Sequence, residues 1–427
     1  MIKLFLPNAF AFAFGRIFVK RKIMTKDYGY VERFGKMGFG MFVHYGLYSV
    51  CGRGEWAYYF NKMPREEYDA LLPKFNVKKD FAKELVAAAK SAGCKYISLT
   101  TRHHDGFSLY DTRGLSDYDV MHTPTKRDLV KEFTDECYKN GITPIFYHTL
   151  MDWRDERFEK NFKEYLVYLR ESVKLLCTEY GNIGGFWFDG GWDKTQEEWE
   201  IKELYALIRK YRPEAMIINN TGLGFQGKVS SPEIDSVTFE RGKPAVVDNS
   251  DRPRAGEMCQ IMNNNWGYSA FDVNYKSVSE LIGDLVDCRK FGCNYLLNVG
   301  PMADGTIKDI ERGILSEIGK WIEVYGESVY DVKPLAVQDD CFVLRGKKCD
   351  YLFVKGLEMI ADEHLNIVKN AKKTVLVDYP EEVKDIAWID NGEELNFARE
   401  GKKLRVRITD FPYGMHYCVR VARIKGK

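Results

Sequence analysis

The sequence predicts a (β/α)8-like barrel followed by a C-terminal antiparallel β-sandwich. Eight short apolar runs, mostly alternating with amphipathic helical stretches, fill roughly the first 330 of the 427 residues. After that point the hydrophobic pattern has a period of two, which is typical of half-buried strands. The alternation by itself leaves a doubly wound open sheet as the alternative to a closed barrel.

The predicted barrel strands are short and mostly apolar throughout, as expected of strands that are covered on both faces. They are Phe39 to His44, Tyr96 to Thr101, Thr143 to His148, Gly185 to Asp189, Ala215 to Asn219, Ser236 to Glu240, Met258 to Met262 and Asn294 to Val299. The segment from Arg241 to Gly256 lacks a helical period, so we expect the sixth and seventh units of the barrel to be irregular.

The predicted helices carry residues that begin and end helices. Ser277 and Glu280 form a capping box, and Gly93, Gly141 and Gly292 follow helical stretches where left-handed C-caps occur. The helices are Lys79 to Ala92, Arg127 to Lys139, Arg157 to Tyr180, Gln196 to Tyr211, Ser277 to Phe291 and Asp309 to Tyr325.

We expect the barrel domain to span residues 25–330 and the β-sandwich residues 331–427. Within the second part, Asp390-Asn391-Gly392 between two strand-like runs predicts a hairpin turn. Residues 1–24 are an N-terminal extension, in which Leu4 to Phe14 is similar to a short signal-peptide core but is interrupted by Pro7 and Asn8. We interpret Met24 as the start of the protein, with a signal peptide as the alternative.

The composition argues against several classes of partner. Lys and Arg total 63 against 62 for Asp and Glu, and this net charge of +1 favours neither nucleic acid nor an anionic membrane. The ten cysteines have no Cys-x-x-Cys spacing, so we interpret them as mostly buried free thiols of a cytoplasmic protein. The oligomeric state stays open, a homo-oligomer included.

Polar residues end seven of the eight apolar runs. In a barrel these ends converge on one mouth, where catalytic groups lie. The residues are His44, His103-His104-Asp105, Tyr147-His148, Asp189, Asn219-Asn220, Glu240 and Asn298.

Asp189 ends an aromatic run and precedes two glycines, which allow close approach of the backbone. Trp187 and Trp192 offer flat surfaces beside this carboxylate, which suits a sugar ring. Hydrolysis of a glycosidic bond needs one carboxylate as nucleophile or base and a second as general acid. Asp189 and Glu240 meet this requirement, and Glu257 competes with Glu240 for the acid role.

The sequence has no motif for a metal or a cofactor. His103 and His104 are adjacent, and adjacent strand positions point to opposite faces, so the two are poor joint ligands. No serine nucleophile elbow, P-loop or dinucleotide fingerprint is found. We expect chemistry without a cofactor, in which neutral histidines bind sugar hydroxyls.

At these residues the chain resembles the α-L-fucosidases of glycoside hydrolase family 29, from about Phe34 to the end. The matching blocks are Phe39-Gly-Met-Phe-Val-His44, Gly54-Glu-Trp, Arg102-His-His-Asp-Gly-Phe107, Trp187-Phe-Asp189-Gly, Trp266-Gly-Tyr and Asn294-Tyr-Leu-Leu-Asn-Val-Gly-Pro301. The resemblance implies a retaining exo-α-L-fucosidase that releases terminal α-L-fucose from fucosylated oligosaccharides or glycoconjugates by double displacement. The alternatives are a retaining barrel glycosidase for another sugar and a non-catalytic sugar-binding protein.

The resemblance also implies residue roles. Asp189 would be the nucleophile, and the segment around Glu240 is similar to the one that carries the acid/base, which favours Glu240 over Glu257. One departure is Thr221, which follows Asn219-Asn220 where the family often has arginine. The residues expected to bind the sugar are His44, Glu55, Trp56, His103, His104, Tyr147, Trp187 and Trp266.

Overall fold

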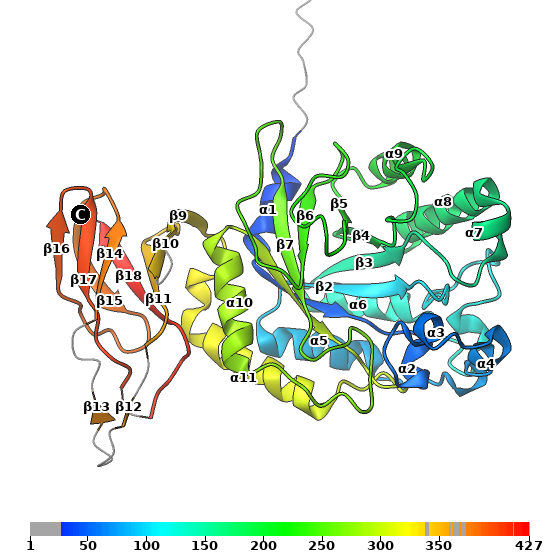
Figure 1. Cartoon of the computed structure of the whole chain (residues 1–427), viewed down its shortest axis with the longest axis horizontal. Coiled ribbons are helices and arrows are strands. Elements are labelled where there is room, and N and C mark those ends of the chain that lie inside the picture. Colours follow the sequence, from blue (N-terminus) through cyan, green and yellow to red (C-terminus); the bar gives the residue numbers. More distant parts are fainter. Residues whose placement is uncertain are drawn as a thin grey trace, which may run out of the picture.

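A closed barrel of eight parallel strands forms the larger part of the molecule (Figure 1). The computed structural model describes residues 27–337, 341–357, 360–361, 367–368, 373–412 and 414–426. Neighbouring strands pair in chain order, and β1 pairs with β8 to close the ring, which confirms the predicted barrel and excludes the open sheet. The strands are β1 (Phe39–Val43), β2 (Tyr96–Arg102), β3 (Thr143–Thr149), β4 (Gly185–Asp189), β5 (Met216–Asn219), β6 (Ser236–Glu240), β7 (Ala255–Gln260) and β8 (Asn294–Val299).

The helices around the barrel match most of the predicted ones, and the Ser277–Glu280 capping box is confirmed. The predicted helix from Arg157 to Tyr180 is two helices, because the backbone leaves the helical conformation at Asn161, with a φ of −149°. The longer helices are α5 (Phe81–Ala92), α6 (Leu129–Asn140), α8 (Phe162–Glu179), α9 (Ile201–Tyr211), α10 (Val278–Lys290) and α11 (Asp309–Tyr325). The short helices are α2 (Tyr48–Cys51), α3 (Ala57–Phe60), α4 (Arg65–Asp69) and α7 (Glu156–Lys160), with 3-10 turns at Leu72–Lys74, Val120–His122 and Gly326–Ser328.

The predicted irregularity lies in the connections and not in the strands. No helix follows β5 or β6, whose connections at 220–235 and 241–254 are fully described. The β5–β6 pairing is correspondingly short, with only Ile218 and Ser236 in register. The seventh strand was predicted at Met258 to Met262, but β7 begins at Ala255, so Glu257 lies within the strand. That prediction was wrong because Gly256 and Glu257 interrupt the apolar pattern.

Helix α1 (Gly29–Met37), which the sequence patterns did not predict, closes the N-terminal end of the barrel. Its Tyr30, Val31 and Phe34 belong to the core inside the barrel. Asn294 of β8 fixes the helix, because its Nδ2 donates to the Phe34 carbonyl at 2.8 Å and its Oδ1 accepts from the Gly38 amide at 3.1 Å. The interior is therefore sealed at this end.

Most of the C-terminal strands form two packed antiparallel sheets, which confirms the predicted sandwich, and β12 and β13 pair as a separate two-stranded sheet. A five-stranded sheet has the order β15-β18-β11-β10-β9, and a three-stranded sheet the order β14-β17-β16. Their facing sides share one buried core. The strands are β9 (Lys333–Val337), β10 (Cys341–Arg345), β11 (Asp350–Val354), β12 (Ile360–Ala361), β13 (Ile367–Val368), β14 (Thr374–Asp378), β15 (Val383–Trp388), β16 (Phe397–Glu400), β17 (Lys403–Arg407) and β18 (Arg420–Gly426).

The sandwich is joined to the barrel through α10 and α11, which lie between the two parts (Figure 1). The indole of Trp321 in α11 donates to the Val419 carbonyl at 3.1 Å. Gly392, with a φ of +72°, turns the chain after β15, and Ala387 then bridges Glu394, as the hairpin signal predicts. The N-terminal extension at residues 1–24 lies outside the described residues.

All ten cysteines are free thiols, and seven of them are buried, as expected from their spacing. Across the described part of the chain, no helix combines the length and the apolar character needed to cross a bilayer.

Candidate active site

Strand β4 delivers Asp189 to the open end of the barrel. Along this strand Trp187 points into the barrel core, and Phe186 and Phe188 point outward to the surrounding helices. Gly190 then takes a φ of +81°, and a Cβ there would lie 2.7 Å from Met151 and 3.0 Å from the His104 ring. Glycine is therefore required for the close approach of His104 to Asp189.

The Asp189 carboxylate is held by two donors. Tyr147 Oη donates to Oδ2 at 3.0 Å, and Asn220 Nδ2 donates to Oδ1 at 3.1 Å. The His104 Nε2 atom lies 3.5 Å from Oδ2. The side chain keeps 13 % of its surface exposed, so the carboxylate is fixed but still reachable from the mouth.

Asn220 links Asp189 to Glu240. The same Nδ2 atom that donates to Asp189 also donates to Glu240 Oε2 at 2.7 Å, so these two carboxylate oxygens lie within about 6 Å of each other. The orientation of this amide is set from its other side, because Asn220 Oδ1 accepts from Thr238 Oγ1 at 3.1 Å and from the Gly222 amide at 3.2 Å.

The surroundings of Glu240 favour its protonated form. Burial, followed by the negative charge of Asp189, raises the pKa of Glu240 to about 7. The hydrogen bond from Asn220 and the charge of Arg241 lower it by less. Near neutral pH Glu240 therefore has a proton to give, as a general acid requires.

His44 is a neutral ring in a fixed tautomer. Its Nδ1 lies 2.7 Å from Asn298 Oδ1, and Asn298 uses its own Nδ2 to donate to the Trp266 carbonyl at 2.7 Å. Nδ1 must therefore carry the hydrogen, which leaves Nε2 as an acceptor. Burial lowers the pKa of His44 to about 3, so the ring stays neutral at physiological pH.

His103 and His104 line the same mouth. His103 stacks on Tyr147 with ring centroids 5.4 Å apart and an interplanar angle of 9°, and burial holds its pKa well below the usual range. His104 donates from Nδ1 to Thr149 Oγ1 at 2.7 Å, because that hydroxyl itself donates to the Met151 carbonyl. His104 thus presents a defined hydrogen-bonding atom, Nε2, beside Asp189.

Aromatic rings form the wall around these polar groups. Trp266 lies over His44 with centroids 5.1 Å apart, and Trp56 meets the edge of His104 at 5.5 Å. Trp192, which is half exposed, also meets His104 at 5.7 Å. Glu55 is buried and accepts from the Gly267 amide at 2.7 Å, which ties the β1 loop to the Trp266 loop.

Glu257 lies inside the barrel below the mouth. Its carboxylate accepts from Tyr96 Oη at 2.5 Å and from Trp187 Nε1 at 2.7 Å, and only 1 % of the residue is exposed. Trp187 in turn stacks under Tyr147, with centroids 5.7 Å apart. The indole of Trp187 thus separates Glu257 from the open end, and Trp187 forms the floor of the site.

Two strand-end residues point away from the mouth. His148 contacts the Thr149 carbonyl on the outer face, and Asn219 donates to Tyr205 Oη of α9. Both directions follow from strand alternation, since Tyr147 and Asn220 take the inward positions. Sequence reasoning missed the bridging role of Asn220 and the wall residue Trp153, which packs on Trp56 at 4.9 Å.

Comparisons with known proteins agree on one family. The family model described as "Alpha-L-fucosidase" matches residues 20–327. The chain belongs to the α-L-fucosidase family. It is therefore a glycoside hydrolase, as the resemblance implied.

Individual α-L-fucosidases match over most of the chain. The tissue α-L-fucosidase of Rattus norvegicus is 27% identical over 72% of this chain and 71% of its own length. The structure of α-L-fucosidase isoenzyme 1 from Paenibacillus thiaminolyticus is 30% identical, with a TM-score of 0.79 over 93% of this chain and 99% of that one. A GH29 α-L-fucosidase from Bacteroides thetaiotaomicron, trapped as a covalent intermediate, shares the fold at 24% identity, with a TM-score of 0.77 over 93% of this chain and 95% of that one.

In this α-L-fucosidase the loop after β5, at residues 220–235, contains no arginine and is held by other hydrogen bonds. Thr221 Oγ1 donates to the Phe225 carbonyl at 2.7 Å, and Gln226 Nε2 donates to the Glu240 carbonyl at 2.8 Å. The loop after β5 is therefore tied to the end of β6, where Glu240 lies. Asn220 makes the direct contact with the carboxylates.

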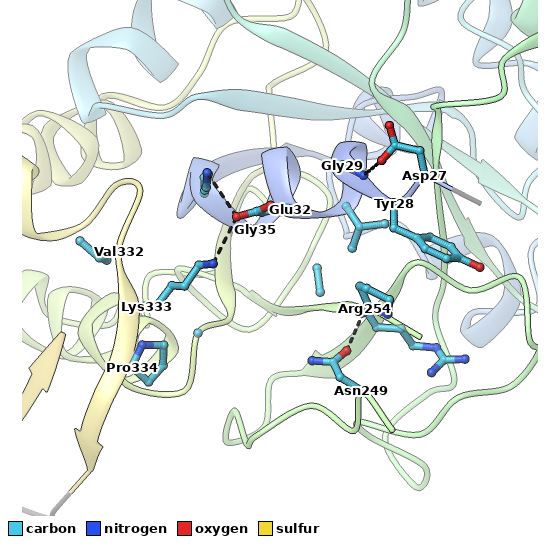
Figure 2. Close-up of a pocket in the computed structure, with 15 residues that line it drawn as sticks. Asp27, Tyr28, Gly29, Glu32, Gly35, Asn249, Arg254, Val332, Lys333 and Pro334 are labelled. Carbon is cyan, nitrogen blue, oxygen red and sulfur yellow. Dashed lines mark hydrogen bonds and ion pairs between the residues drawn. The ribbon is translucent and has the colours of Figure 1, made fainter. Parts of the chain in front are cut away.

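A cavity of about 750 Å³ lies at the sealed end of the fucosidase barrel, between α1, residues 249–255 and β9 (Figure 2). Its acidic groups are already paired: Glu32 accepts from Lys333 at 3.2 Å and Asp27 from the Gly29 amide at 2.9 Å. It contains neither Asp189 nor Glu240. We therefore assign the chemistry to the mouth, where active sites of such barrels lie.

Proposed function

We propose that this α-L-fucosidase releases terminal α-L-fucose from fucosylated oligosaccharides or glycoconjugates by double displacement, with Asp189 as the nucleophile and Glu240 as the general acid/base. The observation that carries the proposal is the Asn220 amide, which donates to both carboxylates from one nitrogen. Retaining glycosidases hold their carboxyl groups about 5–5.5 Å apart, and inverting enzymes about 6.5–9.5 Å apart. The short link through Asn220 favours retention.

In the first step Asp189 attacks the anomeric carbon, the bond to the leaving oxygen breaks, and Glu240 gives its proton to that oxygen. In the second step Glu240 takes a proton from water, which attacks the same carbon and displaces Asp189. Ester formation neutralises Asp189 and so removes one cause of the raised pKa of Glu240, which makes Glu240 a better base when a base is needed. The relative from Bacteroides thetaiotaomicron was trapped at such a covalent stage.

The remaining mouth residues bind the fucose. His44 accepts a hydrogen bond from a sugar hydroxyl at Nε2. His103 and His104 supply further hydrogen-bonding atoms. Trp56 and Trp266 give an apolar wall, which suits the methyl group of a 6-deoxy sugar. Glu55 and Trp187 act at the edge and the floor of this pocket through the contacts described above.

Hydrolysis of an aryl α-L-fucoside by Asp189→Ala, Glu240→Ala and Glu257→Ala tests the assignment. Asp189→Ala should lose at least about a thousandfold in kcat, as expected for removal of a nucleophile. Azide should restore Glu240→Ala and give α-L-fucosyl azide with retained configuration, because the fucosyl-enzyme still forms. Rescue of Glu257→Ala in its place would transfer the acid role, and full activity of Asp189→Ala would overturn the mechanism.

A further inference from the structure

Asn298 ends strand β8 at the mouth but takes no part in the two displacement steps. It occupies an inward position of the strand, since Leu296 belongs to the core inside the barrel and Leu297 to the core outside it. It is in register with Phe42 of β1, and its amide contacts the nearby His44. Only 2 % of Asn298 is exposed, and both ends of its amide are hydrogen-bonded.

The Trp266 carbonyl fixes the direction of a chain of hydrogen bonds. A carbonyl oxygen only accepts, so the end of the Asn298 amide that lies 2.7 Å from it is the donor Nδ2. The amide oxygen then faces His44 Nδ1 at 2.7 Å and requires a hydrogen on that nitrogen. If the amide were reversed, two acceptors would face each other at Trp266, which is costly for buried groups. The backbone at residue 266 thus determines the tautomer of His44 through Asn298.

The peptide group between Trp266 and Gly267 is held on both sides. Its carbonyl accepts from Asn298, and its N–H donates to Glu55 Oε2 at 2.7 Å. A Cβ on Gly300 would lie 2.9 Å from the Trp266 oxygen, so glycine is needed for this loop to lie against the end of β8. The carbonyl therefore stays directed at Asn298.

The second ring nitrogen of His44 is open to the mouth. Nε2 makes no hydrogen bond with any described residue, and it is not among their fully buried unpaired polar atoms. The ring lies between His103 and Trp266, with centroids 5.6 Å and 5.1 Å away, and it is close enough to Asp189 to interact with its charge. A nitrogen that carries a lone pair and no hydrogen thus faces the bound sugar.

We propose that Asn298 is a positioning residue of the fucose pocket, which makes His44 an acceptor at Nε2 so that the pocket binds one sugar hydroxyl through that hydroxyl's own hydrogen. The inference rests on the proposed function, because it requires fucose to occupy the mouth. Its chemical consequence is selectivity against groups that only accept. A fluorine at that position of the sugar ring would face the Nε2 lone pair and bind weakly, whereas a ring with hydrogen on Nε2 would tolerate it.

The first measurement determines the His44 tautomer in the free protein by two-bond ¹H–¹⁵N correlation NMR of ¹⁵N-histidine. The chain has seven histidines, and the signals of His44 are those absent from His44→Gln. At neutral pH the native ring should carry its hydrogen on Nδ1 and no charge, because burial lowers the pKa of His44 to about 3. In Asn298→Leu, which removes both amide contacts at similar size, the Nε2–H tautomer should appear. An unchanged tautomer in the folded variant overturns the proposal.

Asn294→Leu is the matched control. Asn294 is also buried in β8 and uses both ends of its amide, but it lies at the sealed end of the barrel. This control should leave the His44 signals unchanged, and a tautomer change as large as that in Asn298→Leu overturns the proposal. His104, which is held by Thr149, is the internal reference. Asn298→Val serves if Asn298→Leu does not fold.

The second measurement connects the tautomer to the sugar. Inhibition constants against an aryl α-L-fucoside are determined for methyl α-L-fucoside and for its derivatives with fluorine at each ring hydroxyl in turn. At one ring position fluorine should weaken binding about tenfold or more in the native enzyme, and about threefold or less in Asn298→Leu. The KM of Asn298→Leu should rise about tenfold while kcat stays within about threefold, as expected for a lost binding contact.

A purely structural role of Asn298 would change all inhibition constants together and leave the fluorine ratios as they are. Fluorine ratios that are equal in the two proteins at every ring position therefore overturn the proposal, even where the tautomer changes.

Failure of the proposed function is visible separately, since the native protein would then release no fucose from the aryl fucoside. The tautomer is measured without substrate, so it still shows whether Asn298 controls His44. Binding of the same methyl fucosides is then followed by ligand-observed NMR. Fluorine ratios that differ between the native protein and Asn298→Leu at one ring position support the proposal, and equal ratios overturn it.

Discussion

The side-chain amide of Asn220 donates from one nitrogen to Asp189 at 3.1 Å and to Glu240 at 2.7 Å. It thus neighbours both carboxyl groups that the mechanism uses. Its hydrogen bond lowers the pKa of Glu240, opposing the larger effects of burial and of the Asp189 charge. Asn220 therefore adjusts the acidity of one carboxyl group while it fixes the position of both.

We expect Asn220→Ala to lower kcat/KM by about 10- to 100-fold and to move the alkaline limb of the pH profile upward. For the native enzyme, the alkaline limb of the kcat/KM profile should lie near pH 7, where Glu240 loses the proton that it gives to the leaving group. Loss of the Asn220 donor raises the pKa of Glu240, so the remaining activity should extend to higher pH.

The measurement is kcat/KM for an aryl α-L-fucoside between pH 4 and pH 10, roughly the range in which carboxyl groups and histidines titrate. Thr238→Val, which removes only the hydroxyl that orients Asn220, should cause a smaller change in the same direction. An alkaline limb that moves downward in Asn220→Ala would contradict the assigned acid.

Much of the mouth could be predicted from residues at the ends of apolar runs. His44, Asp189 and Glu240 share the mouth because inward positions alternate along each strand and the strand ends converge. The link through Asn220 could not be predicted, since it depends on side-chain rotamers at the ends of three strands.

At the scale of elements, α11 packs closely against α5 at a glycine. A Cβ on Gly319 would lie 1.9 Å from the backbone oxygen of Ser91, and backbone atoms cannot move aside as a flexible side chain can. Gly313 of the same helix is exposed, with no atom within 4 Å of its Cβ position. The two glycines therefore have different structural roles in one helix.

Gly319→Ala should destabilise the fold by about 1–3 kcal/mol, because α11 must move away from α5. Gly313→Ala is the matched control and should stabilise it by up to about 1 kcal/mol, the gain in helix propensity. Urea unfolding followed by circular dichroism measures both values. Equal effects of the two substitutions would contradict the close helix packing.

The apolar runs identified all eight strands because strands covered on both faces have no polar alternation. They misplaced the start of β7, because the predicted strand began at Met258 and left Glu257 outside it. Its partners Tyr96 and Trp187 are 161 and 70 residues away in sequence, so no local pattern could show that this carboxyl group is buried. Helix α1 was missed because its apolar face is short and meets strands far along the chain.

At the scale of the whole molecule, Glu257 joins β7 to β2 and β4 across the barrel interior. Burial raises the pKa of Glu257 to about 7, above its ordinary value of 4.5. The folded protein therefore keeps a proton on Glu257 that the unfolded chain has lost. Stability associated with this residue is complete below pH 4.5 and is lost as the pH rises through 7.

Glu257→Gln should remove this pH dependence, because the amide does not titrate. Relative to the native protein, the variant should gain stability between pH 5 and pH 8, by about 3 kcal/mol at most. Melting temperatures across this range measure the difference, with Glu203→Gln on the exposed side of α9 as the control. A parallel pH dependence of native protein and Glu257→Gln would contradict a protonated Glu257.

The position of α1 has a consequence for the order in which the protein is made. This helix precedes every strand of the described part of the chain, but Asn294 of the last barrel strand fixes its end. During synthesis the ribosome must add all the strands from β1 to β8 before Tyr30, Val31 and Phe34 can be fully covered. Of the described elements, the first to leave the ribosome is thus among the last to reach its final place, and its apolar face stays uncovered while the barrel strands are made.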